Sequence, residues 1–434
     1  MNSMFRSLLD KVGLDTKERR SWALYDVANS AFATTIMVAV LPIYFNDVLA
    51  TELAPNLRSA YWAYFNAFAM IIVALVSPSL GYLADVCGSK KKFLAYYTVL
   101  GAIGCFSLAA LGQGQWMLAG VLFMMSLFAF HVGIIFYEAL LPHISNEENV
   151  HKISSSGYAF GYLGGGVVLA INLAWIQMPE TFGLANAGVA VRLSFVSVGI
   201  CWLLFSIPLF RNVHEPAQAN IQKMSLKLAL SALFRLKDTF VALKKYPQVL
   251  LFLVSFWAYS DGVGTIMNMA TIYGREVGIA SSDLILAILL VQFIGVPASF
   301  AFGPITQRIG PKNSLFITLF IYTGVSVVAY FMTTSLHFWI LAIGVSLVQG
   351  ANQAISRSLF SSMVPLKKSG EFFGLFSIWS RFSGLFGPLV FGLLAEHTGG
   401  SRNSVIFVVA LFTIGIVMLK FVDVDKGKAD ALAA

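Results

Sequence analysis

The chain has 434 residues, of which 58% are hydrophobic and 12% are charged. A soluble domain carries about 25% charged residues, so the composition excludes an ordinary soluble enzyme and predicts a polytopic membrane protein. The net charge of +8 does not indicate nucleic-acid binding, because the basic residues are spread over the segments between apolar runs and do not share one folded face. The three cysteines form no CxxC pair and the histidines show no ligand spacing, so we expect neither a disulfide framework nor a metal site.

Apolar runs of about 20 residues, the length that crosses a bilayer, follow one another along the chain. The first six are predicted over residues 22–45, 60–84, 93–111, 115–139, 154–176 and 191–210. Six more are predicted over residues 249–273, 284–307, 314–334, 338–360, 372–395 and 405–421. The predicted fold is an all-α membrane protein with twelve transmembrane helices in two six-helix pseudo-repeats.

These spans divide the chain into five regions. They are an N-terminal segment (1–21), a first bundle (22–211), a linker (212–248), a second bundle (249–421) and a tail (422–434). Within the linker, apolar and basic residues alternate between 226 and 245, a pattern typical of an amphipathic helix on a membrane surface. The alternative interpretation of this segment is a connector between the two bundles with no membrane-binding role.

The basic residues indicate how the chain crosses the membrane. Of the 29 Lys and Arg residues, 24 fall in one set of alternate segments, with Arg357, Lys367 and Lys368 assigned to the turn between spans ten and eleven. The opposite set holds only Arg58, Arg192, Arg275 and Arg402, and Arg381 lies inside a span. Because Lys and Arg are retained on the cytoplasmic side during insertion, we expect both termini and the linker to be cytoplasmic.

A loop motif occurs in both halves. Gly81, Asp85, Gly88, Lys91 and Lys92 follow span two, and Gly303, Gly310 and Lys312 follow span eight. Both loops have a glycine, six intervening residues, a second glycine and a lysine two positions further on, which is Lys90 in the first loop and Lys312 in the second. Glycines let a helix end in a tight turn, while a carboxylate such as Asp85 pairs with a cation or caps a neighbouring helix. We expect the first loop to act as a gate that controls switching between access states.

The first loop resembles the signature of the major facilitator superfamily, with Val86 where that signature has a basic residue. Further segments resemble the branch that contains the fungal vacuolar amino-acid effluxer of autophagy and its bacterial relatives. They are Trp22-Ala-Leu-Tyr-Asp26, Gly157-Tyr-Ala-Phe-Gly161, Asp261-Gly-Val-Gly-Thr265, Ser356-Arg357-Ser358 and Glu371-Phe-Phe-Gly374. The resemblance implies the major facilitator fold, a cavity lined by the first, fourth, seventh and tenth helices, and outward movement of an amino acid or similar metabolite. It also implies a bacterial inner (cell) membrane location.

Polar side chains recur inside every third span. They are Asp26 and Asn29 in span one, His131 and Glu138 in span four, Asp261, Thr265 and Asn268 in span seven, and Gln349 and Gln353 in span ten. A charge at the bilayer centre costs about 2.5–3.5 kcal/mol on insertion scales, so such residues face a cavity or a partner. We therefore predict a polar pathway, to which Arg381 of span eleven contributes either by pairing with a carboxylate or by binding the solute.

Structural readings remain for several of these residues. Asp26 lies near Arg20 and fits an interfacial cap, His131 fits a buried hydrogen-bonded histidine, and the Gln and Asn side chains fit interhelical hydrogen bonds. Asp261 lies deep in its span, so an ionised carboxylate there must be paired or hydrated. We take Asp261 as the leading coupling residue, with Arg381 as its partner, and place Asp26 and Glu138 behind it.

Together these features predict a secondary active transporter for a small polar solute, driven by an ion gradient. We expect a proton as the coupling ion, no cofactor, no catalytic residues and a monomer in the lipid bilayer. A lipid translocator, or a membrane binding or assembly protein that transports nothing, is the alternative. An apolar groove near spans five and eight would favour the lipid translocator.

Overall fold

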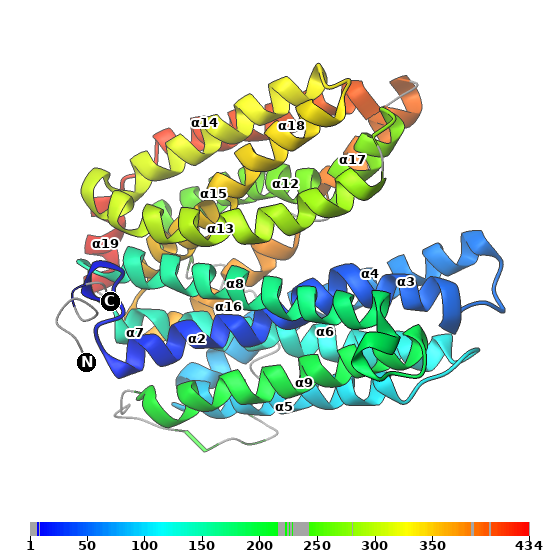
Figure 1. Ribbon diagram of the computed structural model, residues 1–434. Helices are drawn as coiled ribbons and strands as arrows, with labels where there is room; N and C mark the ends of the chain where they lie inside the picture. Colours follow the sequence, from blue (N-terminus) through cyan, green and yellow to red (C-terminus); the bar gives the residue numbers. More distant parts are fainter. Residues whose placement is uncertain are drawn as a thin grey trace.

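The computed structural model describes residues 7, 9–215, 222–223, 225, 228, 243–279, 281–382, 386–398 and 401–433. The chain forms two stacked groups of long helices, one from each half of the sequence, and both chain ends lie at the same end of the stack (Figure 1). This end is called the termini end below. The predicted surface helix at 226–245 falls almost wholly outside the described residues.

The N-terminal half contains the first six spans. Its helices are α2 (Lys17–Ala31), α3 (Leu41–Tyr44), α4 (Pro55–Val86), α5 (Lys90–Ala109), α6 (Trp116–Ala139), α7 (Leu141–Ile144), α8 (Val150–Gln177) and α9 (Ala187–Asn212). A π-helical stretch, η1 (Phe32–Val40), joins α2 to α3, and a second one, η2 (Phe45–Leu49), extends α3, so that the four form one continuous span. Stretches of π-helix are rare and often occur at functional sites.

The C-terminal half contains the remaining spans. Its helices are α12 (Pro247–Glu276), α13 (Ser281–Ile309), α14 (Pro311–Tyr330), α15 (Ser335–Ser362), α16 (Ser369–Phe382), α17 (Phe386–Thr398), α18 (Ser401–Lys420) and α19 (Val424–Leu432). Among the described residues, eleven helical segments are long and apolar enough to cross a membrane. The remaining predicted span, 372–395, contains α16 and α17, and residues 383–385 between them lie outside the description.

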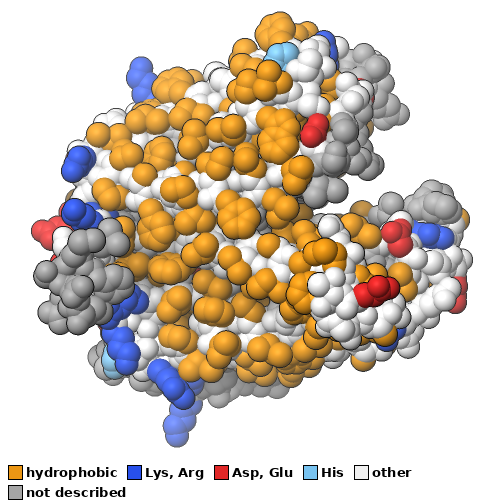
Figure 2. All heavy atoms as spheres, viewed as in Figure 1, with side chains coloured by type: hydrophobic (Ala, Val, Ile, Leu, Met, Phe, Trp, Pro, Cys, Tyr) orange, Lys and Arg blue, Asp and Glu red, His pale blue; other side chains and the backbone are white. Residues whose placement is uncertain are grey.

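The spans are apolar on their outer faces as well as in the core. On α4, Tyr64, Phe68, Ile71 and Leu75 recur at a spacing of three or four residues and are all exposed. Figure 2 shows hydrophobic side chains covering the visible face of both halves, with Lys and Arg near the termini end. A helix that is hydrophobic all round belongs in a core or a bilayer, so this face is the one that contacts lipid.

The two halves meet at the termini end. There α4 packs on α16 and α8 packs on α13, and hydrogen bonds join His143 to Ser369 and His151 to Ser358. At the other end the molecule is hollowed between two lobes (Figure 2). The halves are therefore closed at the termini end and apart at the opposite end.

Candidate functional site

A polar cavity of about 390 Å³ lies between the two halves. Five residues predicted from the sequence line it, namely Asp26, Asn29, His131, Glu138 and Gln353. They come from α2, α6 and α15, which are the first, fourth and tenth spans. The structure thus brings the polar positions of three predicted cavity helices to one place.

A buried ion pair across the two halves forms part of the cavity wall. Nη2 of Arg357, on α15, lies 3.5 Å from Oδ2 of Asp26, on α2. The hydroxyl of Tyr137 donates to the same carboxylate oxygen at 2.7 Å. The Arg357 guanidinium also donates from Nε to Oγ of Ser154 at 2.9 Å and from Nη2 to the Ser154 carbonyl at 2.8 Å. Arg357 therefore links α15 to α2 through an ion pair and to α8 through hydrogen bonds.

Aromatic rings surround this guanidinium. Its central carbon lies 4.4 Å from the ring centre of Tyr158 and 4.8 Å from that of Trp22, within the range of a cation–π attraction. A Cβ on Gly157 would lie 3.0 Å from Nη2 of Arg357, so the glycine lets the ion pair approach the α8 backbone. A charged group so enclosed is stable only while its partner remains in place.

Arg357 corrects the sequence analysis. The assignment of this residue to the turn between spans ten and eleven is wrong, because α15 continues to Ser362 and leaves only 2% of Arg357 exposed. Arg357 follows Gln353 by four residues, which places both side chains on one helical face. That spacing within the predicted tenth span was the available signal.

The seventh span turns a different face to the cavity from the one predicted. The structure places Asp261 outside the cavity lining, where its Oδ1 accepts from the backbone N–H of Gly387 at 2.9 Å, at the start of α17. Its Oδ2 has no hydrogen-bond partner among the described residues. Asn268 is exposed, and α12 lines the cavity with residues that include Ser260 and Met267. Asp261 thus joins α12 to α17.

The other predicted site residues are distributed as follows. Thr265 and Gln349 line a second, apolar cavity formed mostly by the C-terminal half. Thr265 donates to the carbonyl of Asp261 at 2.7 Å. Arg381 belongs to α16, but its side chain lies outside the described part of the structure.

The predicted gating loop lies in the contact between the halves at the termini end. Asp85 accepts from the backbone N–H groups of Gly370 at 3.0 Å and Glu371 at 2.8 Å, at the start of α16, and pairs with Nζ of Lys90 at 2.7 Å. The carboxylate thus caps a helix of the other half, where the helix dipole favours negative charge.

The rest of this loop contacts the other half at Gly81 and its own half at Lys91. Gly81 packs on the Gly370 backbone, and Gly88 adopts a φ of 54°, a conformation that glycine tolerates best. Nζ of Lys91 donates to the carbonyl of Val213 at 2.5 Å, whereas Lys92 is exposed.

The helices, their two halves and the cavity between them define a major facilitator transporter. The proton:xylose symporter XylE bound to 6-bromo-6-deoxy-D-glucose superposes with a TM-score of 0.70 at 15% identity, covering 98% of both chains. The transporter FucP in its outward conformation superposes with a TM-score of 0.68 at 14% identity, covering 97% of this chain and 99% of that one. These likenesses confirm the predicted twelve-helix fold.

The sequence places the chain more narrowly. A family described as vacuole effluxer Atg22 like matches residues 55–432, and the chain belongs to this family. The MFS-type transporter YxiO of Bacillus subtilis is 35% identical, covering 94% of this chain and 95% of that one. Autophagy-related protein 22 of Eremothecium gossypii is 24% identical, covering 90% of this chain and 82% of that one. These relatives confirm the predicted resemblance and the prediction that the chain is a transporter and not an enzyme.

Proposed function

We propose that this transporter moves a small polar solute, with an amino acid as the leading candidate, by proton-coupled alternating access in the direction of efflux. The observation that carries the proposal is the Asp26–Arg357 ion pair, which joins the two halves beside the polar cavity. The match to the vacuole effluxer family supports efflux, and the fold shared with the proton:xylose symporter XylE supports a proton as the coupling ion.

The cavity offers charges of both signs to a solute. Glu138 and Asp26 are acidic, and Arg357 is basic. A free amino acid carries one ammonium and one carboxylate group, so these side chains complement both of its ends. Oδ1 of Asn29, which lines the cavity, has no hydrogen-bond partner among the described residues and can accept from the solute.

The ion pair supplies a physical basis for coupling. To open the termini end, α2 must move away from α15 and Asp26 must leave Arg357. Protonation removes the charge of Asp26 and with it the attraction to Arg357, so a proton binds the two access states with different affinity. Such a difference is what couples an ion to a conformational change.

The orientation belongs to the same proposal. The Lys and Arg residues near the termini end support cytoplasmic termini in a bacterial inner membrane, so the described arrangement opens to the outside. A reporter fused after Ala434 should be active only in the cytoplasm. Activity of that reporter in the periplasm would reverse the topology.

The apolar groove that would favour a lipid translocator is closed where α8 and α13 pack together toward the termini end, although Tyr162 of α8 and Val291 of α13 line an apolar cavity farther along the two helices. Phe160 of α8 contacts Phe300 of α13, with ring centres 6.0 Å apart, and a Cβ on Gly303 would lie 3.1 Å from Cα of Lys152. Spans five and eight are therefore packed together at Lys152, Phe160, Phe300 and Gly303, which leaves no groove at that level.

The test compares two carboxylates in the same reconstituted vesicles, with a solute found by thermal-shift screening of metabolites. Asp26→Asn should abolish uptake driven by a proton gradient but preserve counterflow, because Asn imitates the protonated state. Asp261→Asn is the matched control and should keep both activities, since Asn retains the acceptor for Gly387. The opposite result, with coupling lost only in Asp261→Asn, would transfer the coupling role to Asp261. Loss of neither activity in Asp26→Asn would refute the proposal.

A further inference from the structure

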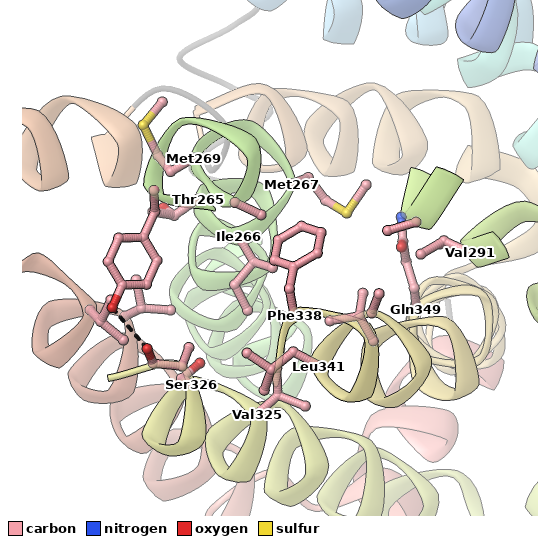
Figure 3. A pocket seen from close by; sticks show the side chains of 18 of the residues that line it. Thr265, Ile266, Met267, Met269, Val291, Val325, Ser326, Phe338, Leu341 and Gln349 are labelled. Atoms are coloured by element: carbon pink, nitrogen blue, oxygen red, sulfur yellow. Dashed lines mark hydrogen bonds between the residues drawn. The ribbon is translucent and has the colours of Figure 1, made fainter. Parts of the chain in front are cut away.

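A second cavity of about 210 Å³ is lined mostly by the C-terminal half, with Val38 and Tyr162 of the N-terminal half, and lies beside the polar cavity. Most of its wall is apolar and comes from α12 to α18, with Ile266, Val291, Val325, Phe338 and Leu341 directed into it (Figure 3). A dry void of about 150 Å³ with such a lining binds benzene. The cavity therefore has room for one aromatic ring with a short extension.

Three hydroxyl groups in the wall, those of Thr265, Tyr273 and Ser326, donate to backbone carbonyls. Ser326 donates to the Tyr322 carbonyl at 2.9 Å, and Thr265 donates to that of Asp261. Tyr273 donates to the Ala329 carbonyl at 2.9 Å. A group in this cavity therefore meets little polar competition, and burial of apolar surface is its main source of affinity.

One edge of the cavity is polar. Gln292 and Gln349 line it, and a Cβ on Gly166 of α8 would lie 3.4 Å from Cβ of Gln292, which places this edge next to the N-terminal half. Gln349 is 8% exposed, and its Oε1 has no hydrogen-bond partner among the described residues. A buried acceptor without a partner is costly, so this edge favours a ligand with a donor group.

The cavity adjoins the polar one and touches both halves. Met267 lines both cavities, and the neighbouring residues Met37 and Val38 line the polar and the apolar cavity respectively. Tyr162 of α8 also belongs to the wall, and a Cβ on Gly350 would lie 2.5 Å from its ring. A group bound in this cavity therefore contacts both halves, which move relative to each other in alternating access, as a transported solute must.

We propose that this apolar cavity binds an aryl or branched alkyl group about the size of a benzene ring, carried by the transported solute, whose polar end lies in the central cavity. That the bound solute is also transported rests on the proposed function. The proposal restricts the substrate to amphipathic molecules with a compact apolar end and a hydrogen-bond donor.

The first experiment measures whether the cavity binds an apolar group at all. Fluorobenzene is titrated into the protein in lipid nanodiscs and followed by fluorine NMR, with empty nanodiscs subtracted. Saturable binding is expected in the wild type, with at least a tenfold loss in Ala342→Phe, which fills the cavity, and a smaller loss in Ala287→Leu. Ile343→Phe is the matched control, since the next residue of α15 is exposed and lies outside the cavity lining. Absence of saturable binding in the wild type, or equal binding in Ala342→Phe, overturns the proposal.

The second experiment tests the link to the polar cavity. It uses 4-fluorophenethylamine and 4-fluorophenylacetate, which add a cationic or anionic end to the same ring. At least one of these two compounds should have a dissociation constant ten times lower than that of fluorobenzene in the wild type. In Ala342→Phe, this difference in affinity should disappear. If neither exceeds fluorobenzene, the amphipathic assignment is wrong. If the wild type carries out counterflow of a solute but shows no saturable fluorobenzene binding, this inference is wrong and the proposed function stands. If the wild type binds fluorobenzene but moves no solute, the proposed function is wrong and the apolar site stands.

Discussion

The loop between α4 and α5 and the loop between α13 and α14 have the same glycine spacing, and each contacts the other half of the molecule. In the first loop, Asp85 is 5% exposed, caps α16 and pairs with Lys90, which is 1% exposed. In the second loop, Gln307 donates to the carbonyl of Glu147 at 3.4 Å, and Lys312 binds two carbonyls of its own half.

The two loops therefore share the glycine spacing of the turn but differ in the interactions that attach each turn to the other half. The α4–α16 contact adds buried charge to close packing of glycines, whereas the α8–α13 contact depends on close packing of glycines and aromatic rings. A buried charge is strongly stabilising in place and costly when its partner leaves, whereas packing changes gradually with distance. The first contact is therefore the one suited to a switch with two states.

The largest expected effect comes from breaking the buried charge pair. Asp85→Ala leaves Lys90 buried without a partner and should lower the free energy of unfolding by about 3–5 kcal/mol. Gln307→Ala, at the corresponding position, removes one long hydrogen bond and should cost less than about 1 kcal/mol. Thermal unfolding of the two variants in nanodiscs measures both losses of stability.

A double variant serves as the control for this prediction. Asp85→Asn with Lys90→Met removes both charges and should recover most of the lost stability, since an ion pair replaced by neutral groups is often tolerated. Equal destabilisation by Asp85→Ala and Gln307→Ala would show that the two loops are held alike.

A milder change should separate switching from binding. Asp85→Asn keeps an acceptor for the start of α16 but loses the charge, so turnover should fall about tenfold, equivalent to about 1.4 kcal/mol. The dissociation constant of the solute should change less than about twofold, because Asp85 lies outside the polar cavity. Flux and equilibrium binding on the same vesicles measure the two quantities. A large loss of affinity in a folded variant would place this loop in the binding site.

The smallest effect is expected at the surface beside the second loop. Nζ of Lys428 lies 3.4 Å from Oε2 of Glu147, and the Glu147 side chain is 68% exposed. Lys428→Ala should change stability by less than about 1 kcal/mol, and high salt should remove even that difference. A double-mutant cycle with Glu147→Ala at low and high salt gives the pair's energy, and a coupling that survives high salt would mean that charge also supports the second contact.

The sequence predicted the spans and three cavity helices because hydropathy and the cost of buried charge act locally along the chain. It did not predict which face of α12 meets the cavity, since hydropathy gives the depth of Asp261 but not its direction. The start of α17 provides Gly387 as a hydrogen-bond donor for Asp261, a contact between residues 126 positions apart. Such pairings arise from the packing of distant helices.

Arg357 shows a second reason for incomplete prediction. A basic residue three positions from the expected end of a span is usually a headgroup anchor, since long basic side chains extend toward the interface. Here α15 continues beyond the expected end, and Asp26, Ser154 and Tyr158 from the other half enclose the guanidinium. Its burial depends on how the two halves dock, which no single span encodes.

The π-helical stretch η1 bears on how relatives of this chain align. Each hydrogen bond of a π-helix spans one residue more than in an α-helix, so Phe32–Val40 accommodates extra chain within the same span. A deletion between Asp26 and Ala31 would instead rotate the flanking residues by about 100° relative to each other, at 3.6 residues per turn, and would turn Asp26 away from Arg357. Single-residue gaps among relatives should therefore fall within Phe32–Val40 and not in the last turn of α2.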